Sequence, residues 1–271
     1  MKQIPNIFTL LNLFAGVMAV IFALQTNSIL IYQNDAYQSS FNIPEKLSWA
    51  AICILIAAVI DFLDGFVARL LNATSEMGKQ LDSLSDVVSF GVAPAVIIYQ
   101  LLRFSYAREE NGIYISIIVL LPAIIIACAS AYRLARFNID DSQQYSFKGL
   151  PVPAAGIFIA SFPLIIHFST SPAINSVIVN KWFLYAVILI ISYLMVSRHR
   201  MIALKFSKYS GIEFYAMLVV AIIGAVVAVV CHWLALPVVI LLYVLLSLIL
   251  KKNSSNDIYS RNKDHAAERS S

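Results

Sequence analysis

Long apolar runs alternate with short polar segments along almost the whole chain. Each run has about 20 residues, the length that an α-helix needs to cross the hydrocarbon core of a membrane. The runs fall at residues 7–25, 48–71, 82–102, 113–136, 152–170, 181–197, 212–231 and 235–250. No stretch shows the strict apolar–polar alternation of a half-buried strand. The pattern therefore predicts an all-α, polytopic membrane helical bundle of eight helices.

The composition agrees with this interpretation. Apolar residues make up 60% of the 271 residues and charged residues only 13%, about half the share in an ordinary soluble domain. The mean hydropathy is +0.81. Residues 251–271 are polar and poor in aromatic side chains, which is typical of a disordered tail. No soluble domain is expected.

The distribution of lysine and arginine predicts the orientation. If the N-terminus lies inside, the outer loops hold only Lys46, Arg103, Arg108 and Lys181, and most other cations lie on the inner side. The positive-inside rule then places both termini in the cytoplasm. The net charge of +4 thus reflects topology and contact with anionic lipid headgroups. No nucleic-acid partner is expected.

Four aspartates interrupt the second and third apolar runs. Asp61 and Asp64 are three residues apart, and Asp82 and Asp86 are four residues apart. This spacing places the members of each pair on one face of a helix. The predicted topology brings both pairs to the same depth, near the cytoplasmic ends of two antiparallel neighbours. A carboxylate in the middle of a membrane costs roughly 2.5–3.5 kcal/mol, so these four need compensation.

Divalent cations would offset both the burial and the mutual repulsion of the carboxylates. Mg²⁺ and Mn²⁺ prefer carboxylate oxygen, and two ions can share four aspartates. Gly65 and Ala68 leave the same helix face free of bulky side chains, and Arg69 is placed for a phosphate. An ion-transport pathway and structural pairing with arginines are the alternatives. Transporter sites are typically near the midplane of repeated halves, and this chain shows no repeat.

Eight residues between positions 61 and 86 follow the spacing D-x2-D-G-x2-A-R-x8-G-x3-D-x3-D. They are Asp61, Asp64, Gly65, Ala68, Arg69, Gly78, Asp82 and Asp86. The spacing resembles the signature of the CDP-alcohol phosphatidyltransferases. This resemblance implies a six-helix membrane core, usually homodimeric, with a site for two divalent cations, Mg²⁺ or Mn²⁺, at its cytoplasmic end in the cell (inner) membrane.

The same resemblance implies a role for each matching position. Asp61, Asp64 and Asp82 would be metal ligands. Asp86 would complete the metal site and act as the general base on an acceptor hydroxyl. The pocket for the cytidine diphosphate group would be lined by Gly65, Ala68, Arg69 and Gly78.

Residues 81–95, LDSLSDVVSFGVAPA, resemble the bacterial integral-membrane phosphatidylserine synthases within that family. In the glycerol-phosphate-accepting branch this region reads more like LDPLADK, so Ser83 replaces a proline and Val87 a lysine. Residues 4–16, 132–138 and 147–156 also look like the serine branch. The resemblance implies phosphatidyl transfer from CDP-diacylglycerol to the L-serine hydroxyl in phospholipid biosynthesis, with release of CMP. Glycerol 3-phosphate and inositol phosphate stay open as alternative acceptors.

Other polar positions allow two interpretations each. Arg133, Arg136 and Lys148 are either inner-face anchors or contacts for the serine carboxylate or a lipid phosphate. Asn6, Thr9 and Asn12 share one face of the first helix, where they bond a neighbouring helix or reach the nucleotide. We expect a phosphatidyltransferase membrane domain over residues 1–210, additional membrane helices over 211–250 and a cytoplasmic tail over 251–271.

Overall fold

The computed structural model describes residues 4–25, 45–71, 75–108, 115–140, 149–169, 171–199 and 232–247. The chain divides into two compact units, one of residues Met1–Asp140 and Pro151–Val196 and the other of residues Asp141–Leu150 and Ser197–Ser271. All four aspartates of the acidic segment belong to the first unit. The predicted boundary at residue 210 and the tail at 251–271 lie outside the described residues.

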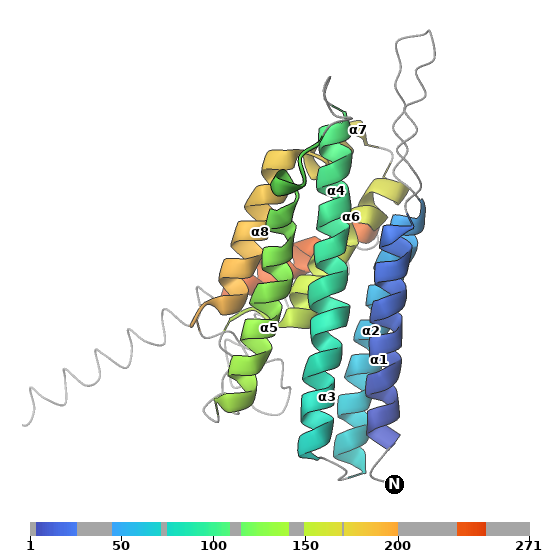
Figure 1. The fold of residues 1–271 in the computed structure, drawn as a ribbon, viewed down its shortest axis with the longest axis vertical. Coiled ribbons are helices and arrows are strands. Elements are labelled where there is room, and N and C mark those ends of the chain that lie inside the picture. Colours follow the sequence, from blue (N-terminus) through green and yellow to red (C-terminus); the bar gives the residue numbers. More distant parts are fainter. Residues whose placement is uncertain are drawn as a thin grey trace, which may run out of the picture. The chain divides into compact units, whose positions relative to one another are not determined.

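The first unit is built of helices throughout its described residues (Figure 1). Its elements are α1 (Ile4–Leu24), α2 (Glu45–Leu70), α3 (Glu76–Asp86), the π-helix η1 (Val87–Val92), α4 (Ala93–Ala107), the short 3₁₀ turns η3 (Ile117–Val119) and η4 (Leu121–Ala123), α5 (Ile124–Ile139), α6 (Val152–Phe168), α7 (Pro172–Ile178) and α8 (Lys181–Val196). The all-α prediction is confirmed.

Four helical stretches are long and apolar enough to cross a membrane: Pro5–Leu24, Glu45–Leu70, Glu76–Ala107 and Ile117–Ile139. The pair α7 and α8, bent by 57°, would be a fifth span. Two shorter apolar helices, Val152–Phe168 and Ala235–Ser247, match two more of the predicted runs. The multi-pass character of the protein is thus confirmed. The run at 212–231 lies outside the described residues, so the count of eight stays a prediction.

The third span begins earlier than the apolar run that predicts it. Ser75 is in an extended conformation and its Oγ accepts a hydrogen bond from the Gly78 amide at 3.0 Å, so it caps α3. Because the helix begins at Glu76, Asp82 lies nearly two turns inside it and not in its first turn. Polar residues of the first turns thus extend the helix beyond the apolar segment.

The π-helix η1 is packed directly against three other helices. A Cβ added at Gly16 of α1 would lie 2.7 Å from the Cα of Ser89, and one added at Gly156 of α6 would lie 3.1 Å from the Cα of Phe90. Gly91, within η1, meets α5 equally closely. Such distances leave no room for a side chain. These glycines therefore let the backbones of α1 and α6 lie against the backbone of η1.

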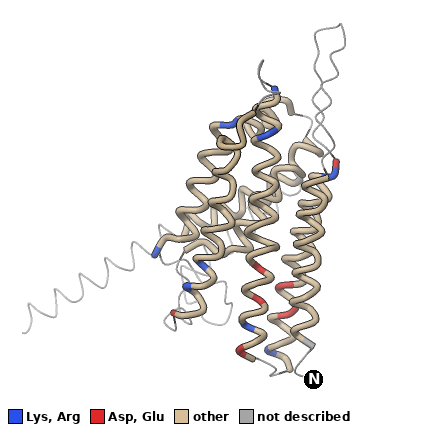
Figure 2. Tube along the Cα trace, viewed as in Figure 1, with Lys and Arg blue, Asp and Glu red and all other residues tan. Residues whose placement is uncertain are grey.

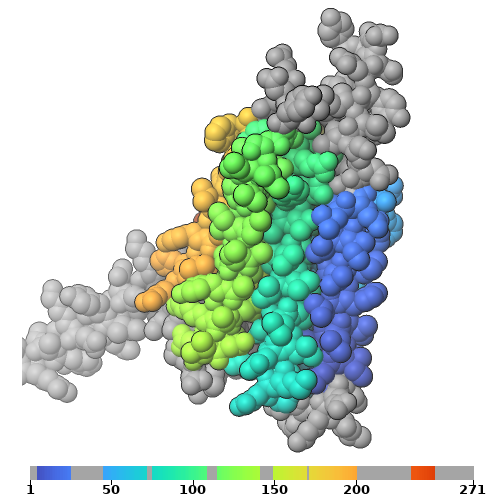
Figure 3. Space-filling model, viewed as in Figure 1, coloured from blue at the N-terminus to red at the C-terminus, as the bar shows by residue number. Residues whose placement is uncertain are grey.

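Hydrogen bonds also join the α3–η1–α4 stretch to α1, beside which it lies (Figure 3). Three side chains donate to backbone carbonyls of α1: Ser85 to Thr9 at 3.0 Å, Ser89 to Asn12 at 3.0 Å, and Gln100 to Ala23 at 2.9 Å. Small polar side chains make such bonds between membrane helices, where no water competes. The relative register of α1 and α3 is consequently fixed next to the aspartates.

Candidate metal centre

Three of the four predicted aspartates form one carboxylate cluster. Asp61, Asp64 and Asp82 each contribute an oxygen, and these oxygens all lie within 4.8 Å of one another. Asp64 is buried and the other two are partly exposed. The acidic positions of α2 and α3 lie at the same level, near the end of the bundle where α1 begins (Figure 2). Like charges this close in a poorly polar surrounding repel strongly.

The free oxygens of the cluster fit a cation. Asp82 Oδ1 is buried and has no hydrogen-bond partner among the described residues. Asp64 Oδ2 accepts a hydrogen bond from Thr9 Oγ1 at 3.1 Å, which orients that carboxylate. Mg²⁺ and Mn²⁺ bind carboxylate oxygens, so the donor set and its unpaired buried atom suit such an ion. These three residues could therefore hold a metal ion.

Asp86 lies beside this cluster, in side-chain hydrogen-bond contact with Asp61. It is one helical turn beyond Asp82, is only 6% exposed, and is not part of the group of oxygens within 4.8 Å. Its Oδ1 accepts a hydrogen bond from Asn12 Nδ2 at 3.1 Å. Three of the four carboxylates thus converge, and the fourth is bonded both to Asp61 and to Asn12. Its role as a metal ligand stays a prediction.

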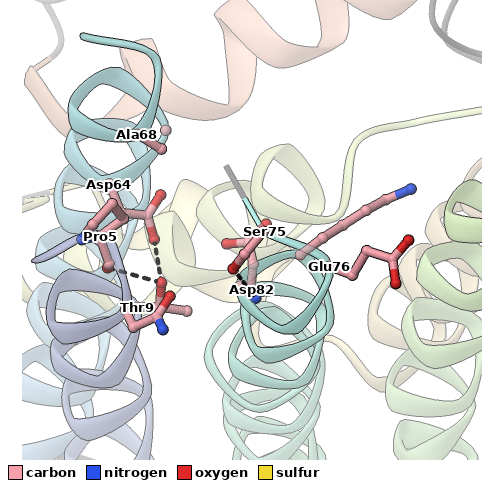
Figure 4. A pocket seen from close by; sticks show the side chains of 11 residues that line it. Pro5, Thr9, Asp64, Ala68, Ser75, Glu76 and Asp82 are labelled. Carbon is pink, nitrogen blue, oxygen red and sulfur yellow. Dashed lines mark hydrogen bonds between the residues drawn. The ribbon is translucent and has the colours of Figure 1, made fainter. Parts of the chain in front are cut away.

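A cavity of about 480 Å³ adjoins the carboxylate cluster (Figure 4). Its lining comes from the starts of α1 and α3 and the end of α2: Pro5, Asn6, Thr9, Asp64, Gly65, Ala68, Ser75, Glu76, Gly78, Lys79 and Asp82. Ligand pockets typically have volumes of roughly 300–1,000 Å³. The cavity is therefore large enough for part of a nucleotide, with two carboxylates of the cluster in its wall.

Small residues keep the α2 side of the cavity open. A Cβ built on Gly65 would meet no atom within 4 Å. Ala68 lines the same wall one turn further, as Figure 4 shows beside Asp64. On the opposite wall Gly78 approaches α1 so closely that its missing Cβ would lie 3.1 Å from Asn6 Oδ1. Glycine thus leaves open space at position 65 and allows close packing at position 78.

The arginines predicted as ligand contacts do not line the cavity. Arg69 is exposed and is not among the lining residues. Arg136 donates from Nη1 to the carbonyl oxygen of Val196 at 3.2 Å, and so it caps the end of α8. Arg133 is buried at 8% exposure, and Lys148 lies outside the described residues. None of the three arginines lines the cavity beside the carboxylate cluster.

Some residues of the cavity wall were not predicted as functional. Lys79 and Glu76 line the cavity, and the Lys79 ammonium donates to the Asn138 carbonyl oxygen at 3.3 Å. Thr9 and Asn12 bond directly to two of the aspartates. Bonding to a neighbouring helix is one of the two interpretations that their shared face on the first helix allowed. Lys79 was treated only as a topology signal, although it follows Gly78 of the motif.

Comparison with protein families gives one match over most of the chain. The model of the CDP-alcohol phosphatidyltransferase family, described as "CDP-alcohol phosphatidyltransferase", matches residues 2–193. These residues include the acidic cluster and the whole lining of the cavity.

Curated proteins similar to this chain carry the name CDP-diacylglycerol–serine O-phosphatidyltransferase. The protein of Helicobacter pylori (strain J99) is 35% identical over 57% of this chain and 54% of its own length. That of Bacillus subtilis is 31% identical over 65% of this chain and 82% of its own. That of Mycobacterium leprae is 32% identical over 90% of this chain and 72% of its own. The matched segment spans about half the length of the first of these relatives.

Proposed function

Because the chain belongs to the CDP-alcohol phosphatidyltransferase family, we propose that it transfers the phosphatidyl group of CDP-diacylglycerol to the hydroxyl of L-serine and releases CMP. The observation that carries the proposal is the carboxylate cluster of Asp61, Asp64 and Asp82 beside a cavity large enough for part of a nucleotide. The choice of serine is supported by the names of the similar proteins and by the sequence of residues 81–95.

The carboxylate cluster would bind the divalent cations that this reaction uses. Asp61, Asp64 and Asp82 would hold two divalent cations, Mg²⁺ or Mn²⁺, which supply positive charge to the pyrophosphate and to the departing CMP. Thr9 orients Asp64 through its hydroxyl, and the open wall at Gly65 and Ala68 admits the headgroup. The lipid tails stay in the bilayer, beside the exposed apolar side chains of the spans.

Asp86 is the residue that we assign as the general base. It accepts the proton of the serine hydroxyl as the serine oxygen forms a bond to the phosphorus that carries the diacylglycerol. The bond from that phosphorus to the phosphate oxygen of CMP breaks, and CMP leaves with the electron pair. Its contact with Asp61 supports this role, because it places a carboxylate next to the position where the cations would bind.

We also propose an orientation in the membrane and an oligomeric state. The site would face the cytoplasm of a cell whose inner membrane holds the protein, with both termini on that side. Two copies would form a homodimer, as in the family. CDP-diacylglycerol would reach the cavity from the bilayer and serine from the water.

A phosphorylated acceptor is the second candidate, because Lys79 places a cation in the cavity wall. Glycerol 3-phosphate or inositol phosphate would gain from such a charge. An acceptor comparison distinguishes the two candidates. Purified protein is given CDP-diacylglycerol, Mn²⁺ and each alcohol in turn, and CMP is measured. We expect CMP with L-serine. Release with glycerol 3-phosphate alone would favour the second candidate.

The same assay tests the proposal as a whole. Absence of CMP with every acceptor, together with ion flux in liposomes that Asp64→Ala abolishes, would identify a cation-coupled transporter instead. Protein with Asp61→Asn serves as the control for release by a contaminating enzyme.

A further inference from the structure

Asn12 is the most deeply buried polar side chain that contacts the site. Its exposed fraction is 0%, and its Nδ2 donates to Asp86 Oδ1 at 3.1 Å. Its side-chain oxygen is buried and has no hydrogen-bond partner within the described part of the chain. The residue is not among those that line the cavity. Asn12 therefore touches Asp86 and has no place against a ligand in the cavity.

The unpaired oxygen indicates that joining two helices is not the main role of Asn12. Leaving a buried acceptor without a donor costs about 1–3 kcal/mol. Gln100 provides the comparison, because it also joins its helix to α1 through an amide, which donates to Ala23. Gln100 has no such buried unpaired oxygen. Asn12 thus carries a cost that a purely structural amide in the same bundle avoids.

The backbone around Asn12 is held in place from two directions. Its carbonyl oxygen accepts a hydrogen bond from Ser89 Oγ at 3.0 Å. One turn further along α1, Gly16 lies against the backbone of Ser89. Since Ser89 follows Asp86 by three residues in the same helical stretch, α1 and the segment carrying Asp86 cannot slide past each other. The amide of Asn12 consequently meets Asp86 in one orientation.

We propose that Asn12 is a positioning residue for Asp86: its amide holds one oxygen of the carboxylate so that the other is directed to the acceptor hydroxyl. This inference rests on the proposed function, in which Asp86 is the base. An asparagine amide donates hydrogen bonds and takes no proton, so Asn12 fixes a direction and leaves the proton transfer to the carboxylate. Thr9 acts on Asp64 in the corresponding way, three residues earlier on the same face.

The test replaces Asn12 by leucine, which has a similar size and no polar group. General acid–base catalysis contributes about 10²–10⁴-fold, and misorientation loses part of it, so we expect kcat to fall about 10–100-fold. The KM values for serine and CDP-diacylglycerol should change by less than about threefold, because Asn12 does not line the cavity. The matched control is Gln100→Leu, which removes another buried amide bonded to α1 and should leave kcat unchanged.

A second variant covers the case in which Asn12→Leu does not fold. Asn12→Ser keeps a polar group that ends one bond short of Asp86, and we expect the same selective loss of kcat. A wild-type kcat in either folded variant, or an equal loss in Gln100→Leu, would overturn the inference while the proposed function stands. A wild-type protein that releases no CMP with any acceptor would remove both.

Discussion

The side chain of Asn138 donates from Nδ2 to Ser83 Oγ at 2.8 Å, and this bond links the end of α5 to α3. Ser83 Oγ in turn donates to the Lys79 carbonyl oxygen at 3.2 Å, and the Lys79 ammonium donates to the Asn138 carbonyl oxygen at 3.3 Å. The three residues form a closed ring of hydrogen bonds. Because Lys79 lines the cavity, the ring ties α5 to the cavity wall.

Loss of this ring should weaken substrate binding more than turnover. Asn138→Ala removes the bond to Ser83, and one hydrogen bond is worth about 1 kcal/mol, so we expect the KM for CDP-diacylglycerol to rise about fivefold. The kcat should change less, because none of the aspartates loses a partner. Steady-state CMP release measures both. Asn175→Ala, which removes a hydrogen bond to Ser169 outside the cavity, is the control. Equal KM values in the two variants would contradict the linkage.

Neutralising the carboxylate cluster should abolish turnover. Asp61→Asn and Asp82→Asn each remove one of the three convergent carboxylates. We expect the rate of CMP release to fall roughly 10²-fold or more, with only weak rescue by added Mn²⁺. Glu45→Gln, an exposed position at the other end of α2, should behave as wild type. Turnover near the wild-type level after single Asn changes at Asp61, Asp64 and Asp82 would show that the metal-site assignment is wrong.

Removal of divalent cations should stop the reaction reversibly. Dialysis against EDTA removes the charge that the three carboxylates would bind, and Mg²⁺ or Mn²⁺ added afterwards should restore CMP release. Binding of Mn²⁺ is also measurable directly by electron paramagnetic resonance. We expect the Asp82→Asn protein to bind Mn²⁺ at least about tenfold more weakly than wild type. Equal Mn²⁺ binding by the two proteins would exclude Asp82 as a ligand.

The size of residue 65 should control access to the cavity. A Cβ at Gly65 meets no atom, so Gly65→Ala should fold normally and gain about 0.4–1 kcal/mol through the reduced entropy of its unfolded chain. Gly65→Leu fills the space beside Asp64, and we expect the KM for CDP-diacylglycerol to rise about tenfold. Val59→Leu adds bulk on an exposed face of α2 and is the control. An unchanged KM in Gly65→Leu would place the headgroup elsewhere.

The glycines against η1 should respond in the opposite way. Gly156→Ala places a Cβ 3.1 Å from the backbone of Phe90, so we expect a loss of about 1–3 kcal/mol in the free energy of unfolding. Thermal unfolding in detergent shows this as a lower Tm, with Gly65→Ala as the matched control. A wild-type Tm for Gly156→Ala would mean that α6 and η1 separate easily.

Local spacing predicted the parts of the site that lie within one helix. The intervals between Asp61, Asp64 and Gly65 predicted that these residues share one helix face. The hydrogen bond that Asp86 accepts from Asn12 was beyond such rules, because the donor is on another helix. The π-helix was equally hidden, since it rests on glycines of α1 and α6.

Cationic residues illustrate the same limit. Arg136 and Lys79 carry the same charge, and sequence alone gave the arginine the better claim to a ligand. The structure bonds Arg136 to the last turn of α8, some 60 positions away, and sets Lys79 in the cavity wall. Which cation reaches the site is decided by tertiary neighbours that no local pattern records.

The hydrogen bonds from Thr9 and Asn12 have a consequence for biosynthesis. Both donors are on α1, which the ribosome completes before either acidic helix. When Asp64 and later Asp86 leave the translocon, the side chain that receives each of them is already in the bilayer. The first helix can thus supply the hydrogen-bond donors for the two carboxylates that enter the membrane after it.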